Sequence, residues 1–277
     1  MAKRLGRSLR FTSPDLNLSV VTDGRQHFAK GDYDQIIDVQ PHLGPDMRHK
    51  LNLDSYSPYE RTLYIDSDCL ATRPIEFMWP LFEGQDFGVC GRMRGDHLWY
   101  GMRIADIRAQ FGIAGPLPVF NGGLMYFNRS EVSQAIFREA RQQFDRYSQI
   151  GLSSSPGRHW AAADEPVLAI AMALNGVGVV EDHGSTMRTP INKTGPIEID
   201  IPAFKCSFVK EGQLVKPAII HFANTSLYDF IYLRETLKIY HPAFGKLLHA
   251  ITDAPYRLGY WLVNPLMMAA RSVLRRS

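Results

Sequence analysis

The sequence predicts an α/β fold in which a mostly parallel sheet is flanked by helices. Short apolar stretches typical of buried strands alternate with segments of helical periodicity, and no hairpin turn joins the first two strands. Strands are expected at residues 16–23, 35–39, 62–65, 86–90, 119–128 and 217–222, and helices at 2–10, 131–147 and 167–176. A chain of 277 residues suffices for one large domain, or for a domain with an appendage.

The composition excludes several classes of protein. A net charge of +3 is too small to indicate a nucleic-acid partner, so we expect none. Three cysteines without metal-ligand spacing favour a reducing compartment and argue against a disulfide framework. No apolar run reaches the roughly 20 residues of a membrane span, and the basic N-terminal region lacks the apolar core of a signal peptide. We therefore expect a soluble cytoplasmic protein.

The N-terminal elements follow from local patterns. Ala2, Leu5 and Leu9 form one apolar stripe of a helix that Ser13-Pro14-Asp15 ends. A strand over residues 16–23, a second over 35–39 and a helical piece near 47–54 follow. The strand over 35–39, the helical piece and the next strand over 62–65 follow one another without a hairpin turn, which favours parallel construction.

The middle of the chain is less regular. Residues 91–118 are rich in glycine, arginine and aromatic residues, and we expect an irregular, mobile segment over a cleft. The bend at Asn121-Gly122-Gly123 permits close backbone approach to a ligand. Ser130 is the expected N-cap of the helix over 131–147.

In the later part of the chain, one acidic residue at the start of a helix has two interpretations. Asp164-Glu165-Pro166 opens the helix that ends near Gly176, and Asp164 is either a helix cap or a functional acid. Residues 181–216 are predicted to be rich in loops, with extended pieces around 197–199. A final apolar strand over 217–222 contains His221.

Residues 241–277 are expected to form a helical appendage. Residues 256–277 are predicted to contain a terminal helix with an apolar face and a basic face, which suits peripheral contact with an anionic membrane at its inner face. Docking of this helix on the rest of the protein explains the pattern equally well. The residues concerned are Trp261, Leu262, Val263, Leu266, Arg271, Arg275 and Arg276.

An acidic pair, Asp66 and Asp68, follows the apolar run over residues 62–65. Side chains alternate along a strand, so both carboxylates can face the same way where the strand stops. Two such charges repel by roughly 4 kcal/mol at an effective dielectric near 20, and a divalent cation would relieve this repulsion. Solvated acids in a strand-end turn are the alternative interpretation. Mg²⁺ and Mn²⁺ are the ions that carboxylates favour.

The order of four motifs is more specific than any one of them. LYIDSD, FNGGLMYFN, ADEPVLAIA and IIHF occur in this order over residues 63–222. This arrangement resembles the GT-A nucleotide-sugar glycosyltransferases, with family 8 and its relatives looking closest. The resemblance implies a GT-A domain over residues 1–240, with residues 241–277 as the appendage.

The resemblance also implies a metal site and a donor site. Asp66, Asp68 and His221 would bind Mn²⁺ or Mg²⁺, which would hold the diphosphate of a sugar nucleotide, most simply a UDP-sugar. The donor-sugar and acceptor side would be lined by Asn121, Gly122 and Gly123, and Arg61 would help to bind nucleotide or phosphate. Asp164 would bind sugar hydroxyls, and Asp164 or Glu165 could serve as the base of an inverting enzyme. A retaining enzyme could use the leaving diphosphate instead.

Three positions depart from the family pattern. Such enzymes open with a strand that holds the nucleotide base, whereas this chain opens with the following helix, so we expect either a truncated start or a sheet without that strand. The family's Asp-Gln is Asp164-Glu165 here. The usual Lys-Pro-Trp after the histidine is replaced by Asn224-Thr225-Ser226, which leaves a diphosphate-binding lysine unassigned.

The predicted function is metal-dependent transfer of a sugar from a nucleotide-sugar donor to a glycan or glycolipid acceptor. One alternative is a catalytically degenerate GT-A domain that acts as a binding module. The other is a haloacid-dehalogenase phosphatase with a nucleophilic aspartate, which fits less well because Leu70 stands where that family places Thr or Val.

Overall fold

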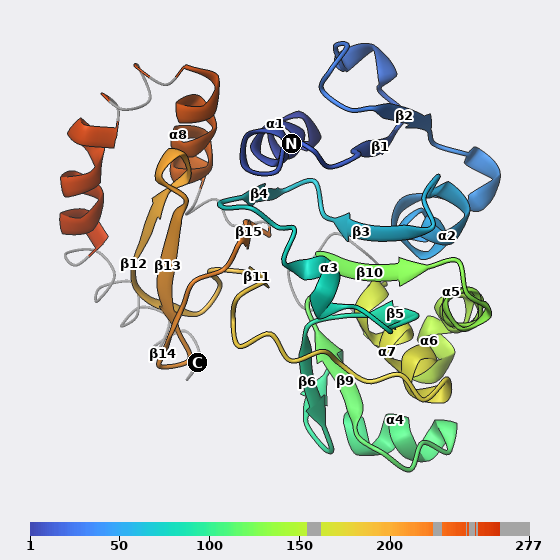
Figure 1. Ribbon diagram of the computed structural model, residues 1–277. Coiled ribbons are helices and arrows are strands. Elements are labelled where there is room, and N and C mark those ends of the chain that lie inside the picture. Colours follow the sequence, from blue (N-terminus) through green and yellow to red (C-terminus); the bar gives the residue numbers. More distant parts are fainter. Residues whose placement is uncertain (154–161, 224–228, 242, 244–246, 248, 261–277) are drawn as a thin grey trace. The chain divides into compact units, whose positions relative to one another are not determined.

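The computed structural model describes residues 1–153, 162–223, 229–241, 243, 247 and 249–260 (Figure 1). The chain divides into two compact units. Unit 1 contains residues 1–16, 67–76 and those from 183 onward, and unit 2 contains residues 17–66 and 77–182. The chain passes from unit 2 to unit 1 between Asp66 and Ser67, which assigns the acidic pair, Asp66 and Asp68, to different units.

A three-stranded antiparallel sheet lies in the middle of unit 2. Strand β10 (Leu124–Asn128) pairs with β3 (Arg61–Ile65) on one side and with β5 (Phe87–Gly88) on the other (Figure 1). Leu124 is opposite Ile65, so the turn before β10 meets the end of β3. This register places the Asn-Gly-Gly bend beside Asp66.

The parallel pair predicted near the N-terminus is present in unit 2. Strands β1 (Ser19–Thr22) and β2 (Gln35–Asp38) run parallel, with Ser19 opposite Gln35. The helical piece predicted after them is a series of short turns. These are η2 (Pro41–Leu43), η3 (Asp46–Arg48), η4 (Lys50–Asn52) and α2 (Leu53–Tyr56), while η1 (Arg25–His27) lies between β1 and β2.

Residues 91–118 are more regular than predicted. Strands β6 (Gly91–Arg94) and β9 (Leu117–Phe120) form an antiparallel pair, and β7 (Leu98–Trp99) and β8 (Met102–Arg103) form a hairpin, followed by α4 (Ile104–Phe111). The hairpin turn is Tyr100-Gly101, where φ is +48° and +83°. Both central residues have positive φ, as in a type I′ turn, and this twist matches that of the strands.

The helices of unit 2 match the sequence pattern. Helix α5 (Glu131–Asp145) begins after the predicted N-cap, where the Ser130 hydroxyl accepts a hydrogen bond from the Ser133 N–H (3.2 Å). Helix α7 (Asp164–Leu174) is buried over residues 166–172 and packs in the main apolar core of the unit. The remaining short helices are α3 (Met78–Leu81) and α6 (Tyr147–Ile150).

Unit 1 begins with α1 (Ala2–Thr12), whose residues Leu5 and Leu9 are buried as the stripe predicts. Helix α1 packs beside β4 (Cys69–Ala71), which pairs antiparallel with β15 (Ile219–His221). Strand β11 (Met187–Arg188) pairs with β15 in parallel. The predicted final strand and the residues directly after Asp68 are therefore neighbours in one small sheet.

Residues 181–216 contain more strand than predicted. Strands β12 (Lys193–Asp200), β13 (Lys205–Lys210) and β14 (Gln213–Val215) form an antiparallel meander, with η5 (Ile201–Ala203) before β13. The turn before β14 is Glu211-Gly212, again with two positive φ values (+52° and +77°). Helix α8 (Asp229–Tyr240) packs near this meander, and residues 249–260 are helical.

The expectation of a mostly parallel sheet is wrong for the described strands. Of the nine strand pairings found among them, only β1 with β2 and β11 with β15 are parallel. An apolar run indicates that a strand is buried, but it does not indicate the direction of the neighbouring strand. In addition, the hairpin turns at Tyr100-Gly101 and Glu211-Gly212 lack the Asn-Gly or Asp-Gly sequence that usually marks such turns. The mixed α/β class itself is confirmed.

Two predicted features fall outside the described residues. These are the Asn-Thr-Ser sequence at 224–226 and residues 261–277 of the tail. Where the chain is described, none of its helices combines the length and the apolar character needed to cross a bilayer.

Candidate functional site

Asp66 lies directly after β3, at the turn that leads into β10. Its backbone N–H donates to the Gly123 carbonyl (2.9 Å), which fixes the end of the strand. Its carboxylate accepts a hydrogen bond from the Tyr64 hydroxyl and lies 3.2 and 3.3 Å, by its two oxygens, from Lys50 Nζ. Asp66 is therefore bound by a cationic and a phenolic group of its own unit.

Lys50 joins two carboxylates in the interior of unit 2. Its Nζ lies 2.9 Å from Asp164 Oδ2, in addition to its contact with Asp66. Burial of Lys50 lowers its pKa, but the negative charges of Asp164 and Asp66 outweigh that effect and hold the pKa well above its ordinary value. Lys50 is thus a fixed positive charge between two acids.

The two interpretations of Asp164 can now be compared. The N-cap position of α7 is Ala163, so Asp164 does not cap the helix. Its side chain is 7% exposed and faces Lys50 instead. A carboxylate in the first turn also complements the positive end of the helix dipole. Asp164 is a buried, ion-paired acid.

Glu165 connects two turns of unit 2. Its Oε1 accepts a hydrogen bond from the Gly122 N–H (3.0 Å), and its Oε2 accepts one from the Tyr100 hydroxyl (2.5 Å). Burial raises the pKa of Glu165, the charge of Asp164 raises it further, and the hydrogen bonds from Tyr100 and Gly122 act in the opposite direction. Glu165 is therefore easier to protonate than an ordinary glutamate, as a proton-transfer group requires.

Gly122 is required by the closeness of these acids. A Cβ at this position would lie 2.6 Å from Asp164 Oδ2, 3.2 Å from Lys50 Nζ and 3.3 Å from Glu165 Cγ. In the same turn, Asn121 Oδ1 accepts a hydrogen bond from the Gly123 N–H (2.9 Å). The predicted residues of the bend are thus gathered against Asp164 and Glu165.

Arg61 is not brought to this group. It is the first residue of β3, whereas Asp66 follows the last, and five residues of strand span roughly 16 Å. Its guanidinium lies over the Trp79 ring, with 5.6 Å between Cζ and the ring centroid.

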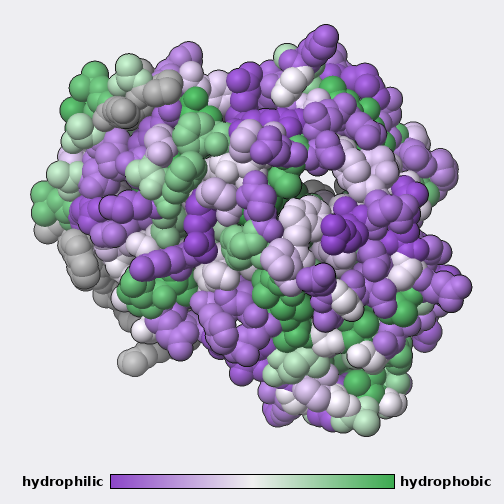
Figure 2. Space-filling view, in the orientation of Figure 1, coloured by the Kyte–Doolittle hydropathy of each residue, from purple (hydrophilic) through white to green (hydrophobic). Residues whose placement is uncertain are grey.

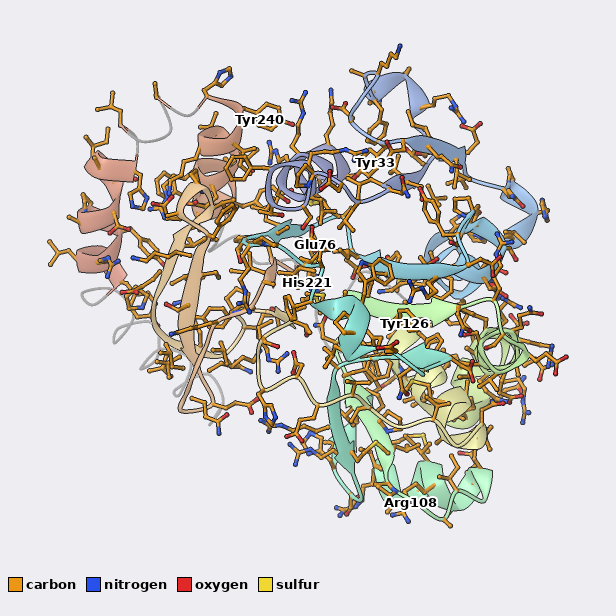
Figure 3. The ribbon with its side chains drawn as sticks, in the orientation of Figure 1. Tyr33, Glu76, Arg108, Tyr126, His221 and Tyr240 are labelled. Atoms are coloured by element: carbon orange, nitrogen blue, oxygen red, sulfur yellow. The ribbon has the colours of Figure 1, made fainter. Side chains whose placement is uncertain are left out.

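The second cluster lies in unit 1. Cys69 of β4 is opposite His221 of β15, and Asp68 immediately precedes β4. His221 Nε2 lies 3.1 Å from Asp68 Oδ1, and the Phe222 N–H donates to the Asp68 carbonyl (3.2 Å). Figure 3 labels His221 on β15. Two residues that the sequence resemblance paired are therefore adjacent.

The ligand atoms of Asp68, Cys69 and His221 all lie within 4.8 Å of one another. A carboxylate oxygen and an imidazole nitrogen at this separation suit Mn²⁺, and a thiolate would add affinity for softer ions such as Zn²⁺. Cys69 is fully buried, and His221 is 6% exposed. The donor set fits a divalent cation that keeps open positions for further ligands.

Sequence reasoning missed three residues of these clusters. Lys50 and Tyr64 carry no motif, and Cys69 was considered only for disulfides and for cysteine-based metal spacing. Tyr100 belongs to residues 91–118, where the sequence suggested either contact with a ligand or ordinary packing for this tyrosine. Tyr64 was placed in the correct strand, and its position two residues before Asp66 was a usable signal because alternate residues share a face. Lys50 lacked any such local signal.

No protein-family model matches the sequence, and no curated protein matches it either. Solved structures do match in fold. The apo structure of WbbM, a bifunctional glycosyltransferase, has a TM-score of 0.51 at 10% identity, covering 86% of this chain and 48% of that one. This chain thus matches about half of that longer protein.

Two further structures match with lower scores. Galactosyltransferase LgtC, solved with donor and acceptor sugar analogues, has a TM-score of 0.47 at 16% identity, covering 81% of this chain and 84% of that one. Mouse xyloside xylosyltransferase 1 has a TM-score of 0.45 at 13% identity, covering 80% and 93%. The predicted resemblance to GT-A glycosyltransferases is confirmed at the level of the fold, which this chain shares with WbbM.

Proposed function

We propose that the protein is a metal-dependent glycosyltransferase that moves a sugar from a nucleotide-sugar donor to a glycan or glycolipid acceptor. The observation that carries this proposal is the pairing of Asp68 with His221 (3.1 Å) in a chain with the fold of a glycosyltransferase. Fold alone does not determine activity, so the residues must supply the chemistry.

In unit 1, Asp68 and His221 are the proposed ligands of Mn²⁺ or Mg²⁺, and Cys69 lies beside them. Asp66, two residues before Asp68 in the chain, is the proposed third ligand. Such an ion stabilises the negative charge that builds up on a departing diphosphate. Asp68 and His221 supply one oxygen and one nitrogen, which leaves coordination positions for phosphate oxygens.

In unit 2, the proposed sugar-binding residues surround the Asn-Gly-Gly turn. Asp164 and Glu165 are buried polar groups held in fixed positions by Lys50 and Tyr100. Carboxylates of this kind accept hydrogen bonds from sugar hydroxyls. Asn121, Gly122 and Gly123 bring backbone amides to the same place, and Arg61 remains a proposed nucleotide or phosphate contact on sequence grounds.

In the proposed reaction, the bond between the anomeric carbon and the diphosphate oxygen breaks, and a bond to the acceptor oxygen forms. The acceptor hydroxyl loses its proton. The raised pKa of Glu165 suits it to take up that proton in an inverting enzyme. In a retaining enzyme the leaving diphosphate would take it instead, and the acids would position the sugar.

We also propose that the C-terminal region contacts an anionic membrane. In unit 1, Leu247, Ile251 and Leu258 are 59%, 61% and 62% exposed, at helical spacing. Figure 2 shows hydrophobic residues at the surface along this helix. The sequence after residue 260 adds further apolar residues and three arginines, Arg271, Arg275 and Arg276. It contains no aspartate or glutamate. An apolar face continued by basic residues suits anionic lipid.

A donor screen tests the proposed enzyme. UDP-, GDP- and TDP-sugars are incubated with the protein with and without Mn²⁺, and hydrolysis or transfer is followed. We expect turnover with one donor class that requires the ion, and none in Asp68→Ala at unchanged thermal stability. Binding of a sugar nucleotide without any turnover would indicate the binding module instead. Phosphate transfer to Asp66 without a sugar donor would indicate a phosphatase.

A further inference from the structure

We infer that Arg4, on α1, binds the phosphate groups of the ligand whose cation is held by Asp68 and His221. The inference rests on the proposed function, because it assigns a residue to the same ligand. The usual Lys-Pro-Trp is replaced by Asn224-Thr225-Ser226, which leaves the diphosphate of this ligand without an assigned lysine. Arg4 belongs to the same unit as Asp68 and His221.

Helix α1 is fastened to the strand that follows Asp68. The Ser8 hydroxyl accepts a hydrogen bond from the Ala71 N–H of β4 (2.9 Å), and Figure 1 shows α1 beside β4. Arg4 lies one helical turn before Ser8, and Cys69 lies two residues before Ala71. The helix and the strand therefore hold Arg4 in a fixed relation to the Asp68 segment.

A chain of ring contacts leads from Arg4 to the cluster. The Arg4 guanidinium lies over the ring of Tyr232 on α8, with 5.1 Å between Cζ and the ring centroid. Tyr232 packs edge-on against Phe222, with ring centroids 5.1 Å apart. Phe222 is bonded to Asp68 through its backbone N–H and directly follows His221 in sequence.

The charges of Arg4 and Asp68 act on the pKa of the same two groups, Tyr232 and the Met1 amino group. Burial raises the pKa of Tyr232 to about 12, Arg4 acts in the opposite direction, and Asp68 adds to the rise. The pKa of the Met1 amino group is lowered by burial and by Arg4, and Asp68 again acts in the opposite direction.

The charge of Arg4 is available to a ligand. Among the described residues, no carboxylate forms an ion pair with Arg4, and its stacking partner Tyr232 stays neutral at pH 7. Stacking on the Tyr232 ring fixes the plane of the guanidinium. A planar guanidinium can donate two parallel hydrogen bonds to one phosphate, and it stays charged at any pH that the protein tolerates.

Arg7 provides a matched control on the same helix. Its guanidinium lies over the ring of Tyr240, another tyrosine of α8, with 5.0 Å between Cζ and the centroid. The two arginines thus share helix, residue type and kind of stacking partner. Tyr240 lies two helical turns beyond Tyr232 on α8, and its ring is not in the chain of contacts to Phe222.

The experiment measures binding by calorimetry with two probes, inorganic pyrophosphate and UDP, each with Mn²⁺ present. Wild type is compared with Arg4→Gln, Arg4→Lys and Arg7→Gln. Loss of a charge-assisted contact is expected to weaken both probes about 10- to 100-fold in Arg4→Gln. Arg4→Lys should recover part of the affinity, and Arg7→Gln should bind as wild type does. Binding of Mn²⁺ alone, followed by its electron spin resonance, should stay unchanged in Arg4→Gln.

Each outcome is decisive. Equal binding by Arg4→Gln and wild type would overturn the inference, as would an equal loss in Arg7→Gln or a loss of Mn²⁺ binding in Arg4→Gln. Weakened pyrophosphate binding in Arg4→Gln, together with no transfer from any sugar nucleotide, would leave the inference standing and overturn the proposed function. If wild type binds neither probe, both are wrong.

Discussion

Lys50 and Asp164 form a buried ion pair in unit 2, with 2.9 Å between Nζ and Oδ2 and with both side chains less than 10% exposed. The same ammonium group contacts Asp66. One lysine therefore neutralises two acids that the sequence resemblance assigned to sugar and metal binding. Replacing Lys50 should therefore leave both Asp66 and Asp164 without their cationic partner.

Lys50→Met is expected to destabilise the protein by about 3–5 kcal/mol, because it leaves two carboxylates in the interior without their cation. Urea unfolding measures this loss. Lys50→Met combined with Asp164→Asn should recover part of it, since one of the stranded charges is then absent. The exposed Lys30→Met serves as the control, and an equal loss there would contradict the assigned role of Lys50.

Gly122→Ala is expected to cost about 1–3 kcal/mol of stability, because the new methyl group would lie 2.6 Å from Asp164 Oδ2. Thermal unfolding measures the change. The control is Gly115→Ala, where nothing lies within 4 Å of the added Cβ. Equal unfolding temperatures for the two variants would show that the turn moves freely away from the acids.

Glu165→Gln should change how stability depends on pH. The pKa of Glu165 is raised in the folded protein, so the folded state holds its proton more tightly than the unfolded state does. This contribution to stability is fully present below the unfolded pKa, ordinarily about 4.3, and is lost as pH rises through the folded pKa. The stability of wild type relative to Glu165→Gln should therefore fall over that range and then level off.

Urea unfolding of both proteins between pH 4 and pH 8 measures the difference. Glu83→Gln, at an exposed position, is the control. A difference between wild type and Glu165→Gln that stays constant over the whole range would contradict the raised pKa.

Cys69→Ser should alter metal preference. The thiol lies with the ligand atoms of Asp68 and His221, and sulfur favours soft ions. We expect affinity for Cd²⁺ to fall about tenfold or more, with Mn²⁺ affinity nearly unchanged, as measured by calorimetry. Cys206→Ser, which removes another buried thiol of the same unit, is the control. If Cys69→Ser binds Cd²⁺ as tightly as wild type, the thiol does not ligate the ion.

Ile251→Ser combined with Leu258→Ser should weaken binding to anionic vesicles on the order of 10- to 100-fold, because each exposed side chain contributes apolar area. Co-sedimentation with phosphatidylglycerol vesicles measures this, and neutral phosphatidylcholine vesicles should bind less. Leu214→Ser is the control, since Leu214 is 62% exposed in the same unit. If wild type does not sediment with either vesicle, the membrane contact is excluded.

The sequence predicted the elements whose signals are local. The stripe of Leu5 and Leu9 gave α1, the Ser130 cap gave α5, and the apolar run before Asp66 gave β3. The tight turns at Tyr100-Gly101 and Glu211-Gly212 were missed, because the first residue of each is unusual at positive φ. This is why two regions predicted to be irregular contain hairpins.

The residues of the candidate site could be predicted only where they belong to a recognisable sequence motif. Asp68 and His221 are far apart in the sequence, and only the resemblance paired them before the strands β4 and β15 placed them together. Lys50 has no motif, and its significance comes from contacts with residues of β3 and α7. Burial and long-range pairing decide such contacts, and neither can be read from a short window.

Tyr100 occupies the first position of its hairpin turn with φ of +48°, and its hydroxyl is bonded to Glu165. A left-handed conformation costs a bulky residue about 1–2 kcal/mol, whereas glycine or asparagine would adopt it with little cost. Engineering for heat resistance would therefore favour replacing this tyrosine, and the same replacement would release the Glu165 carboxylate, which also accepts a hydrogen bond from Gly122. At position 100, a residue that stabilises the turn and a residue that holds Glu165 in place are therefore different residues.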